Sequence, residues 1–222
     1  MLRSGGTGVG YWEAEAVIEG LGASRGLFRA RELDGTGVCR AWLTVLEEFS
    51  QVKHVSFGVW SHPRYTPTRY EVVQLRTPAA VLWGPSALWV QGFLEQEPER
   101  LWLAIDDHAR APRHLDACTT VVRSRRADDA VVVVQPLRTA LPLRVQDPAH
   151  AAGASRRRLR RKTLQAAERS ELATALEGLR ATPLSDEQRA QRARSPTLPM
   201  PRRKTFPGGY WLELLKASGR AP

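Results

Sequence analysis

The chain has 222 residues, of which 42% are hydrophobic and 25% charged, and its formal net charge at pH 7 is +10. These proportions are ordinary for a globular protein with a hydrophobic core. A membrane-spanning helix is excluded, because the best apolar run, Val131 to Val134, is far shorter than the roughly 20 residues that such a helix needs.

The start of the chain and its two cysteines bear on location. The stretch from Met1 to Gly10 is rich in glycine and has no apolar core like that of a secretory signal. Cys39 and Cys118 lie far apart, and two thiols are too few for a disulfide framework or a zinc site. We expect both to be small buried residues in a reducing compartment, the cytoplasm, and we expect no metal or other cofactor.

Charge is distributed unevenly and divides the chain into three segments. Residues 1–62 contain six Lys+Arg and seven Asp+Glu, residues 63–150 contain eleven and ten, and residues 151–222 contain sixteen and six. Almost all of the positive excess therefore lies in the last third. Such a basic segment favours a polyanionic partner.

The first segment, residues 1–62, has the pattern of a winged helix-turn-helix DNA-binding domain. Apolar spacing and glycine positions indicate three helices, from Trp12 to Leu21 with an end at Gly22, from Phe28 to Leu33, and from Val38 to Phe49. A turn at Gly35 to Gly37 separates the last two. Two strands follow, from Gln51 to Val55 and from Phe57 to Ser61. This order of elements is the one expected of the winged helix.

The second segment, residues 63–150, is predicted to be a small α+β domain. The stretch from His62 to Thr77, with three prolines, is interpreted as an ordered connector, and Ser86 to Gln91 as a short helix capped by Ser86. Short β-branched runs then predict four strands, at Leu101–Ile105, Thr119–Arg123, Ala130–Gln135 and Leu141–Val145.

The third segment, residues 151–222, is predicted to be a basic, mostly helical C-terminal region. Ser155 to Leu179 indicates one strongly basic helix, Ser195 to Pro201 a proline-rich break, and Tyr210 to Lys216 a last short helix. The fold class expected for the whole chain is α+β, with a winged helix-turn-helix, a small mixed α/β domain and a basic helical tail.

Four stretches of the first segment carry a likeness to a known family: Gly26 to Leu33, Gly37-Val38, Leu43 to Leu46 and Gly58-Val59-Trp60. Through them the segment resembles the N-terminal domain of the AbiEi-like antitoxins. In that family the wing commonly ends in Gly-Val-Tyr, so Trp60 stands where a tyrosine is usual.

The second segment is similar to the region that follows in the same family. There a Ser-Ala-Leu helix ending in His-Gly-Leu precedes a strand, and the matching stretches are Thr77 to Ala79, Ser86 to Phe93 and Pro98 to Ile105. Gln91 and Phe93 depart from His-Gly-Leu. The family's late Arg-Thr-x-x-Asp is missing, with Gln146-Asp147-Pro148-Ala149 near its place, and the resemblance covers about residues 12–150.

This resemblance implies a transcriptional regulator with two activities. Its DNA-binding domain would repress its own operon, and the following region would counteract a toxin in a type IV toxin–antitoxin system of the abortive-infection type. The partner toxin is typically a nucleotidyltransferase encoded next door, and the antagonism is indirect. A free-standing transcription factor of the same build, without a toxin, is the first alternative.

Several residues are candidates for contacts with operator DNA. The N-terminal turn of a recognition helix meets the base edges, which places Cys39, Arg40 and Thr44 nearest the DNA, with Arg40 suited to a bidentate guanine contact. Trp42, beside them, is interpreted as packing. On the wing, Lys53, His54 and Ser56 would contact the backbone or minor groove, and Arg29 and Arg31 would hold phosphates. A homodimer would suit a repressor.

The near-neutral charge of residues 1–62 is an objection to DNA binding, because phosphate neutralisation normally dominates affinity. A degenerate winged helix used for protein contact is therefore also open. The basic run Arg156, Arg157, Arg158, Arg160, Arg161 and Lys162 could supply the missing charge or form a solvated helix face. A second alternative is thus an interaction protein whose basic tail binds nucleic acid or an acidic partner.

Catalytic motifs are incomplete, and we expect no enzyme. Gly84 to Leu88 begins like a nucleophile elbow but lacks the final glycine, so Ser86 is interpreted as a helix cap. A metal site could be sought in Asp106, Asp107, His108 and His114, but these ligands are few for such a site. Aspartates are common in turns, which explains their presence without a metal.

Overall fold

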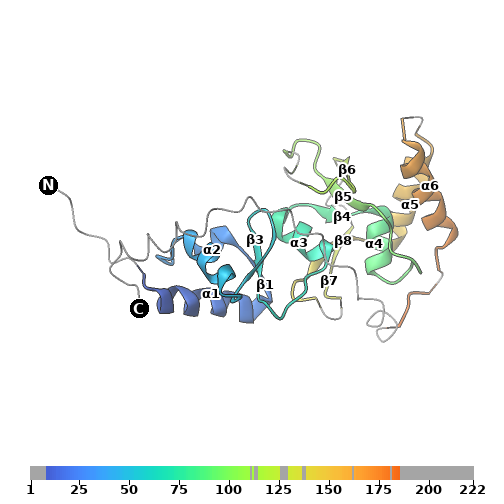
Figure 1. Cartoon of the computed structure of the whole chain (residues 1–222). Coiled ribbons are helices and arrows are strands. Elements are labelled where there is room, and N and C mark those ends of the chain that lie inside the picture. Colours follow the sequence, from blue (N-terminus) through green and yellow to red (C-terminus); the bar gives the residue numbers. More distant parts are fainter. Residues whose placement is uncertain are drawn as a thin grey trace. The chain divides into compact units, whose positions relative to one another are not determined.

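The computed structural model of the chain describes residues 9–110, 112, 115–125, 130–136, 139–161, 163–180 and 182–185. It divides into two compact units at the junction between Tyr65 and Thr66. We call residues 9–65 the N-terminal unit and the described residues from 66 to 185 the C-terminal unit. The described residues form six α-helices, one 3-10 helix and two small sheets, so the fold is mixed α and β, as the predicted α+β class requires (Figure 1).

The N-terminal unit contains three helices and one small antiparallel sheet. Its elements are α1 (Tyr11–Arg25), β1 (Leu27–Arg29), the 3-10 helix η1 (Ala30–Leu33), α2 (Ala41–Glu48), β2 (Lys53–Ser56) and β3 (Val59–Ser61). The strand order is β1-β3-β2, so β3 pairs with both neighbours. Between β2 and β3, Phe57 and Gly58 form the tip of a tight hairpin, and Gly58 has a positive φ of 69°.

The core of the N-terminal unit joins its helices to the sheet. Ile18 of α1, Phe28 of β1, Leu43 and Leu46 of α2 and Trp60 of β3 belong to one buried cluster. These positions come from the apolar spacing of the helices and from the inward alternation of the short strands. Their burial fixes the N-terminal turn of α2 at the surface, next to the turn that precedes it.

Two local predictions for this unit are wrong. The first helix does not end at Gly22, because α1 continues to Arg25 and Gly26 ends it with a left-handed φ of 65°. Leu27 to Arg29 is a strand that pairs with β3, where a helix from Phe28 was expected, and only Ala30 to Leu33 is helical. A three-residue strand has no periodicity of its own, so its pairing partner decides the conformation.

The C-terminal unit is a five-stranded mixed sheet with four helices. Its elements are α3 (Arg69–Arg76), β4 (Val81–Leu82), α4 (Gly84–Val90), β5 (Leu101–Ile105), β6 (Thr119–Arg123), β7 (Val131–Val134), β8 (Leu143–Gln146), α5 (Pro148–Leu159) and α6 (Ala166–Glu177). The strand order is β6-β5-β4-β8-β7. The β5–β6 and β4–β8 pairs are parallel, and the other two are antiparallel.

The four strands predicted for this segment are present, with β5 and β6 at the predicted bounds. The connector prediction for His62 to Thr77 is wrong over Arg69 to Arg76, which form α3. The single basic helix predicted from Ser155 to Leu179 is two helices, α5 and α6. The expected boundary at residue 150 falls inside α5, and the predicted helix at Tyr210 to Lys216 lies outside the described residues.

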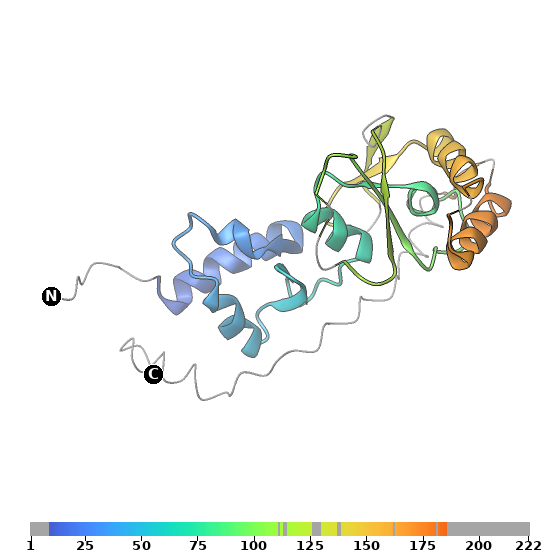
Figure 2. The same ribbon diagram turned by 90° about the horizontal axis from the view of Figure 1, so that it is seen from above.

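Helices α4, α5 and α6 pack together in the C-terminal unit, and Figure 2 shows α5 and α6 side by side. Side chains alternate along β5. Leu101 and Leu103 enter one buried cluster, and Trp102 and Ala104 enter another. Both clusters contain residues of α5 and α6, so these two helices are part of the core. No helix among the described residues is long and apolar enough to cross a membrane.

Candidate nucleic-acid interface and basic pocket

The start of α2 lies at the surface of the N-terminal unit. Cys39 and Arg40 precede the helix and are exposed, and Thr44, in the first turn, is half-buried. Trp42 packs against the core cluster from its edge and contacts Tyr11, with ring centroids 5.9 Å apart. The expected burial of the cysteines is wrong, because Cys39 and Cys118 are both exposed and free.

Arg40 is held in an ion pair rather than directed freely outward. Its Nη2 lies 2.7 Å from each carboxylate oxygen of Asp34, the residue at the end of η1. The pair therefore bridges the turn that joins η1 to α2. Both side chains remain more than half exposed, at 57% and 61%, so water screens the pair and its net contribution to stability is small. A guanine edge or a phosphate can compete with Asp34 for this guanidinium.

The two arginines around η1 differ in their surroundings. Arg29 is half-buried, and its Nε donates to Glu32 at 3.3 Å, while Arg25 pairs with the same carboxylate at 3.2 Å. Arg31 is exposed, and no ion pair includes it among the residues that the structure describes. Of these predicted phosphate contacts, Arg31 is the one whose guanidinium is turned to solvent without a competing carboxylate.

The predicted wing contacts lie on β2. Lys53 and Ser56 are half-buried. The imidazole of His54 packs edge-on against Trp60 with 4.9 Å between ring centroids. Desolvation lowers the pKa of His54 below its ordinary value, and a hydrogen bond with the Ser56 backbone opposes this shift. In the unbound protein this lowered pKa favours the neutral imidazole of His54 near pH 7.

The charge of the N-terminal unit is close to neutral. Residues 9–65 contain six Lys+Arg and seven Asp+Glu. Two acidic side chains lie on α2 itself, and one of them, Glu47, accepts a hydrogen bond from the His54 backbone at 3.3 Å. The unit thus brings the eight predicted contact residues into one domain without making a strongly positive surface.

The basic run from Arg156 to Lys162 lies at the C-terminal end of α5. Arg156, Arg157 and Arg158 form the last turn of the helix, and Arg160 and Arg161 follow it. Lys162 lies outside the described residues. Of the described arginines in this run, Arg157, Arg158 and Arg161 line a pocket, and Arg156 and Arg160 do not. Arg158 is half-buried, and the other four are exposed.

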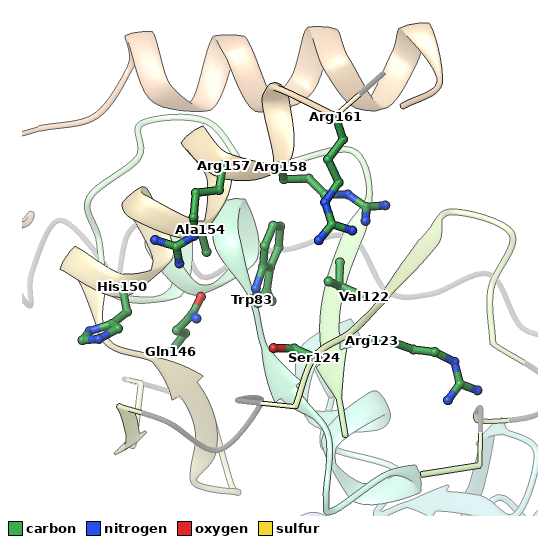
Figure 3. Close-up of a pocket in the computed structure, with 10 residues that line it drawn as sticks. All are labelled: Trp83, Val122, Arg123, Ser124, Gln146, His150, Ala154, Arg157, Arg158 and Arg161. Atoms are coloured by element: carbon green, nitrogen blue, oxygen red, sulfur yellow. The ribbon is translucent and has the colours of Figure 1, made fainter. Parts of the chain in front are cut away.

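The pocket has a volume of about 540 Å³ and lies between α5, β6, the end of β8 and the start of α4 (Figure 3). Ten described residues line it, and none of these is acidic: Trp83, Val122, Arg123, Ser124, Gln146, His150, Ala154, Arg157, Arg158 and Arg161. Trp83 is nearly buried and stacks on Trp102 at 5.7 Å between centroids. Figure 3 shows Arg158 and Arg161 above Trp83, and Arg157 above Gln146.

Two of the basic side chains of this pocket, Arg123 and His150, already interact with neighbouring groups of the protein. Arg123 donates from Nη1 to the backbone oxygens of Asp107 and Ala109, at 2.7 and 3.0 Å, and Figure 3 shows it pointing away from the other arginines. His150 contacts Asp147 at 3.3 Å. No ion pair among the described residues includes Arg157, Arg158 or Arg161.

A purely structural role for these three arginines would be to neutralise the negative end of α5. Another residue already serves that end. Arg169 of α6 donates from Nη1 to the backbone oxygen of Leu159 and from Nη2 to that of Arg161, both at 3.1 Å. Arg169 thus bonds one carbonyl of the last turn of α5 and one carbonyl just beyond it, so it shares this role with the arginines.

Two stretches were candidates for catalysis or metal binding, namely Gly84 to Leu88 and the residues from Asp106 to His114. Ser86 is fully buried, and its hydroxyl accepts a hydrogen bond from the Trp102 backbone at 2.9 Å, so it positions α4 against β5. It does not cap α4, because the helix begins at Gly84. Among the described residues, which do not include His114, no group of three His, Cys, Asp or Glu could hold a metal ion.

No family model matches the chain, and no curated protein matches it. Among solved structures, the chain is similar to the Rv2827c protein from Mycobacterium tuberculosis, with 19% sequence identity. That match covers 86% of this chain and 78% of the other, with a TM-score of 0.38. A TM-score this low carries no inference about fold or function.

Proposed function

We propose that the protein is a DNA-binding transcriptional regulator whose N-terminal unit is a winged helix-turn-helix. In this proposal η1 and α2 form the helix-turn-helix, α2 enters the major groove, and the β2–β3 hairpin is the wing. The protein acts by binding its own operator and not by catalysis.

One observation carries the proposal, namely the order and pairing of elements in residues 9–65. Helix, strand, helix, helix and two strands follow one another, and the first strand pairs with the last, giving β1-β3-β2. A winged helix has this order, with its recognition helix directly before the hairpin. Arg40 stands at the N-terminal end of α2, the end from which side chains reach base edges.

In this proposal, the preference for the operator sequence and the sequence-independent affinity for DNA come from different parts of the chain. Phosphate contacts supply most of the affinity of DNA-binding proteins, and a unit with six basic and seven acidic residues offers few. The exposed guanidinium groups of Arg156 and Arg160 lie outside the pocket and are suited to such contacts. In this proposal Arg40 selects the sequence, and the basic run at the end of α5 strengthens binding to any DNA.

The test is a titration of labelled DNA from upstream of the protein's own gene, against scrambled DNA, over a series of salt concentrations. The full chain should prefer its own DNA, and Arg40→Ala should reduce that preference about 10- to 100-fold, the range for loss of a bidentate base contact. The double variant Arg156→Gln/Arg160→Gln should weaken binding to both DNAs equally and lower the salt slope by up to about 2.

Arg64→Ala is the matched control, because Arg64 is exposed, belongs to the same unit and lies beyond β3. It should leave the preference unchanged. Equal binding of both DNAs at every salt concentration, with no effect of Arg40→Ala, would remove the regulator proposal. If Arg156→Gln/Arg160→Gln also abolished binding, the protein would be an interaction protein with a non-specific basic surface.

We propose further that the protein is the antitoxin of a type IV system, which rests on the resemblance of residues 12–150 to the AbiEi-like antitoxins. The toxin would be a nucleotidyltransferase encoded beside it. Expression of that neighbouring gene alone should arrest growth. Expression of the same gene together with this chain should restore growth. If this chain did not relieve the growth arrest, the antitoxin proposal would be rejected and only the proposal of a transcriptional regulator would stand.

A further inference from the structure

We propose that the pocket between α5, β6 and β8 binds a small phosphorylated ligand of about the size of a mononucleotide. Arg157, Arg158 and Arg161 would hold its phosphate, and Gln146 would accept a hydrogen bond from a hydroxyl or amino group of the same molecule. The residues of this inference differ from those that the proposal above assigns to DNA, which are Arg40 in the N-terminal unit and Arg156 and Arg160 outside the pocket.

The first argument is the uncompensated charge. Three arginines line one hollow of the C-terminal unit, of which Arg158 is half-buried and Arg157 and Arg161 are exposed. None of the described residues that line this hollow is acidic, and no ion pair among the described residues includes any of the three arginines. Water and salt screen the charge of the half-buried Arg158 less than they screen a fully exposed charge. Such a cluster is stable when an anion binds between the charges, and phosphate oxygens match the guanidinium donors in geometry.

The second argument is that two buried polar atoms of this pocket lack a partner. Arg158 Nε, a donor, and Gln146 Oε1, an acceptor, are both buried and form no hydrogen bond. Gln146 is only 8% exposed, so water reaches it poorly. A buried polar group without a partner is costly, and in native proteins one usually has a role. A ligand that carries both an acceptor and a donor would satisfy both atoms at once.

The third argument concerns size and shape. The volume of about 540 Å³ lies within the range of small-molecule sites. Trp83, Val122 and Ala154 give the pocket an apolar wall, against which the ring of a sugar or base can pack. A concave site of this size admits one phosphorylated small molecule, whereas a nucleic-acid duplex binds along an extended surface. These features favour a nucleotide or a sugar phosphate over the backbone of DNA.

The test is calorimetric titration of the full chain with five probes: adenosine 5′-monophosphate, ribose 5-phosphate, adenosine, sulfate and a short single-stranded DNA. We expect the phosphate esters to bind and adenosine not to bind, because it lacks the anion. Sulfate, which lacks a donor for Gln146, should bind at least about tenfold more weakly than the esters, as expected for one lost hydrogen bond to a buried group.

Three variants test the assignment of residues. Arg158→Gln/Arg161→Gln should lower the affinity for the phosphate esters at least about tenfold, because it removes two charge-assisted contacts. Gln146→Leu should lower it for the esters and leave sulfate unchanged. Arg156→Gln/Arg160→Gln removes the same charge from the same segment, and it should change the affinity less than about twofold, because neither side chain lines the pocket and salt screens charges at a distance from the ligand.

Several results would overturn the inference. They are no binding of either phosphate ester at millimolar concentration, equal losses in the pocket and control variants, or binding of the single-stranded DNA alone. If sulfate bound as tightly as the phosphate esters, the pocket would be a simple anion site. The proposal of a nucleotide or sugar phosphate as its ligand would then be rejected. The probe comparison on the unaltered chain decides these points even if a variant fails to fold. It also leaves the operator titration with Arg40→Ala untouched.

Discussion

At the scale of single residues, the proposed DNA contact of Arg40 would compete with its ion pair to Asp34. The carboxylate holds the guanidinium at 2.7 Å, yet both groups are more than half exposed, so the pair contributes at most about 1 kcal/mol. Asp34→Asn should therefore change the stability little. It should raise the affinity for the native operator by about 2- to 10-fold, because it frees Arg40 and removes a negative charge near the phosphates. Direct titration of labelled DNA measures this effect.

Glu19→Gln is the control for net charge, since Glu19 is exposed on α1 and in the same unit. An equal gain in affinity from Glu19→Gln would mean that the effect is general electrostatics and not release of Arg40. Weaker binding by Asp34→Asn would show that the clamp across the η1–α2 turn is needed for recognition, which is the opposite of our expectation.

Residue types alone predicted some environments and misjudged others. Cys39 and Cys118 were expected to be buried because cysteine usually is, yet both are exposed, Cys39 shortly before α2 and Cys118 directly before β6. Arg40 was placed correctly at the start of α2, but its pairing with Asp34 depends on the fold of the turn. Gln146 drew attention only as part of a missing family motif, and nothing in its sequence context reveals a buried oxygen without a partner.

At the scale of elements, the close approach of α4 to α5 depends on Gly84. This residue has a φ of 49°, and a Cβ placed there would lie 2.9 Å from Ser155 Oγ. Gly84→Ala should therefore destabilise the C-terminal unit by about 1–3 kcal/mol through backbone strain and this contact. Thermal or chemical unfolding of the full chain measures the loss.

Gly153→Ala is the comparison within the same pair of helices. Gly153 lies inside α5 and its added Cβ would meet only the end of Arg157, at 3.5 Å, an ordinary contact. Alanine there should raise the stability by about 0.5–1 kcal/mol through its better helix propensity. Equal effects of the two substitutions would mean that the α4–α5 contact is looser than the structure has it.

Strands and helices with a clear pattern in their own sequence could be predicted, whereas those that form only by pairing with other strands could not. β5 and β6 were predicted at their observed bounds because a β-branched or apolar run is bounded by charged residues or proline. β4 has two residues and exists only between β5 and β8, so no local pattern indicates it. α3 carries a readable signal, a capping box from Thr68 to Glu71, but the surrounding prolines outweighed it.

At the scale of the whole molecule, charge was a poor guide to the limits of the folded units. The shift in composition at residue 150 suggested a separate basic region, whereas α5 and α6 complete the core of the C-terminal unit. Glu171 of α6 accepts hydrogen bonds from the Trp102 indole at 3.1 Å and from the Arg100 backbone at 2.9 Å. Ending the chain after Ala149 would remove these contacts, so we test the basic run by substitution instead.

The role of α6 in this core is tested by two leucines of the same helix. Leu172 is fully buried in the cluster that contains Trp83 and Trp102, and Leu176 is half-exposed. Leu172→Ala should cost about 3–5 kcal/mol, the range for a large-to-small change in a packed core. Leu176→Ala should cost less than about 1 kcal/mol, because surface substitutions rarely cost more. Denaturant unfolding of the full chain measures both. Small and equal losses would instead mean that α6 is a solvated helix that does not hold Trp83 and Ala154, two residues of the pocket wall, in place.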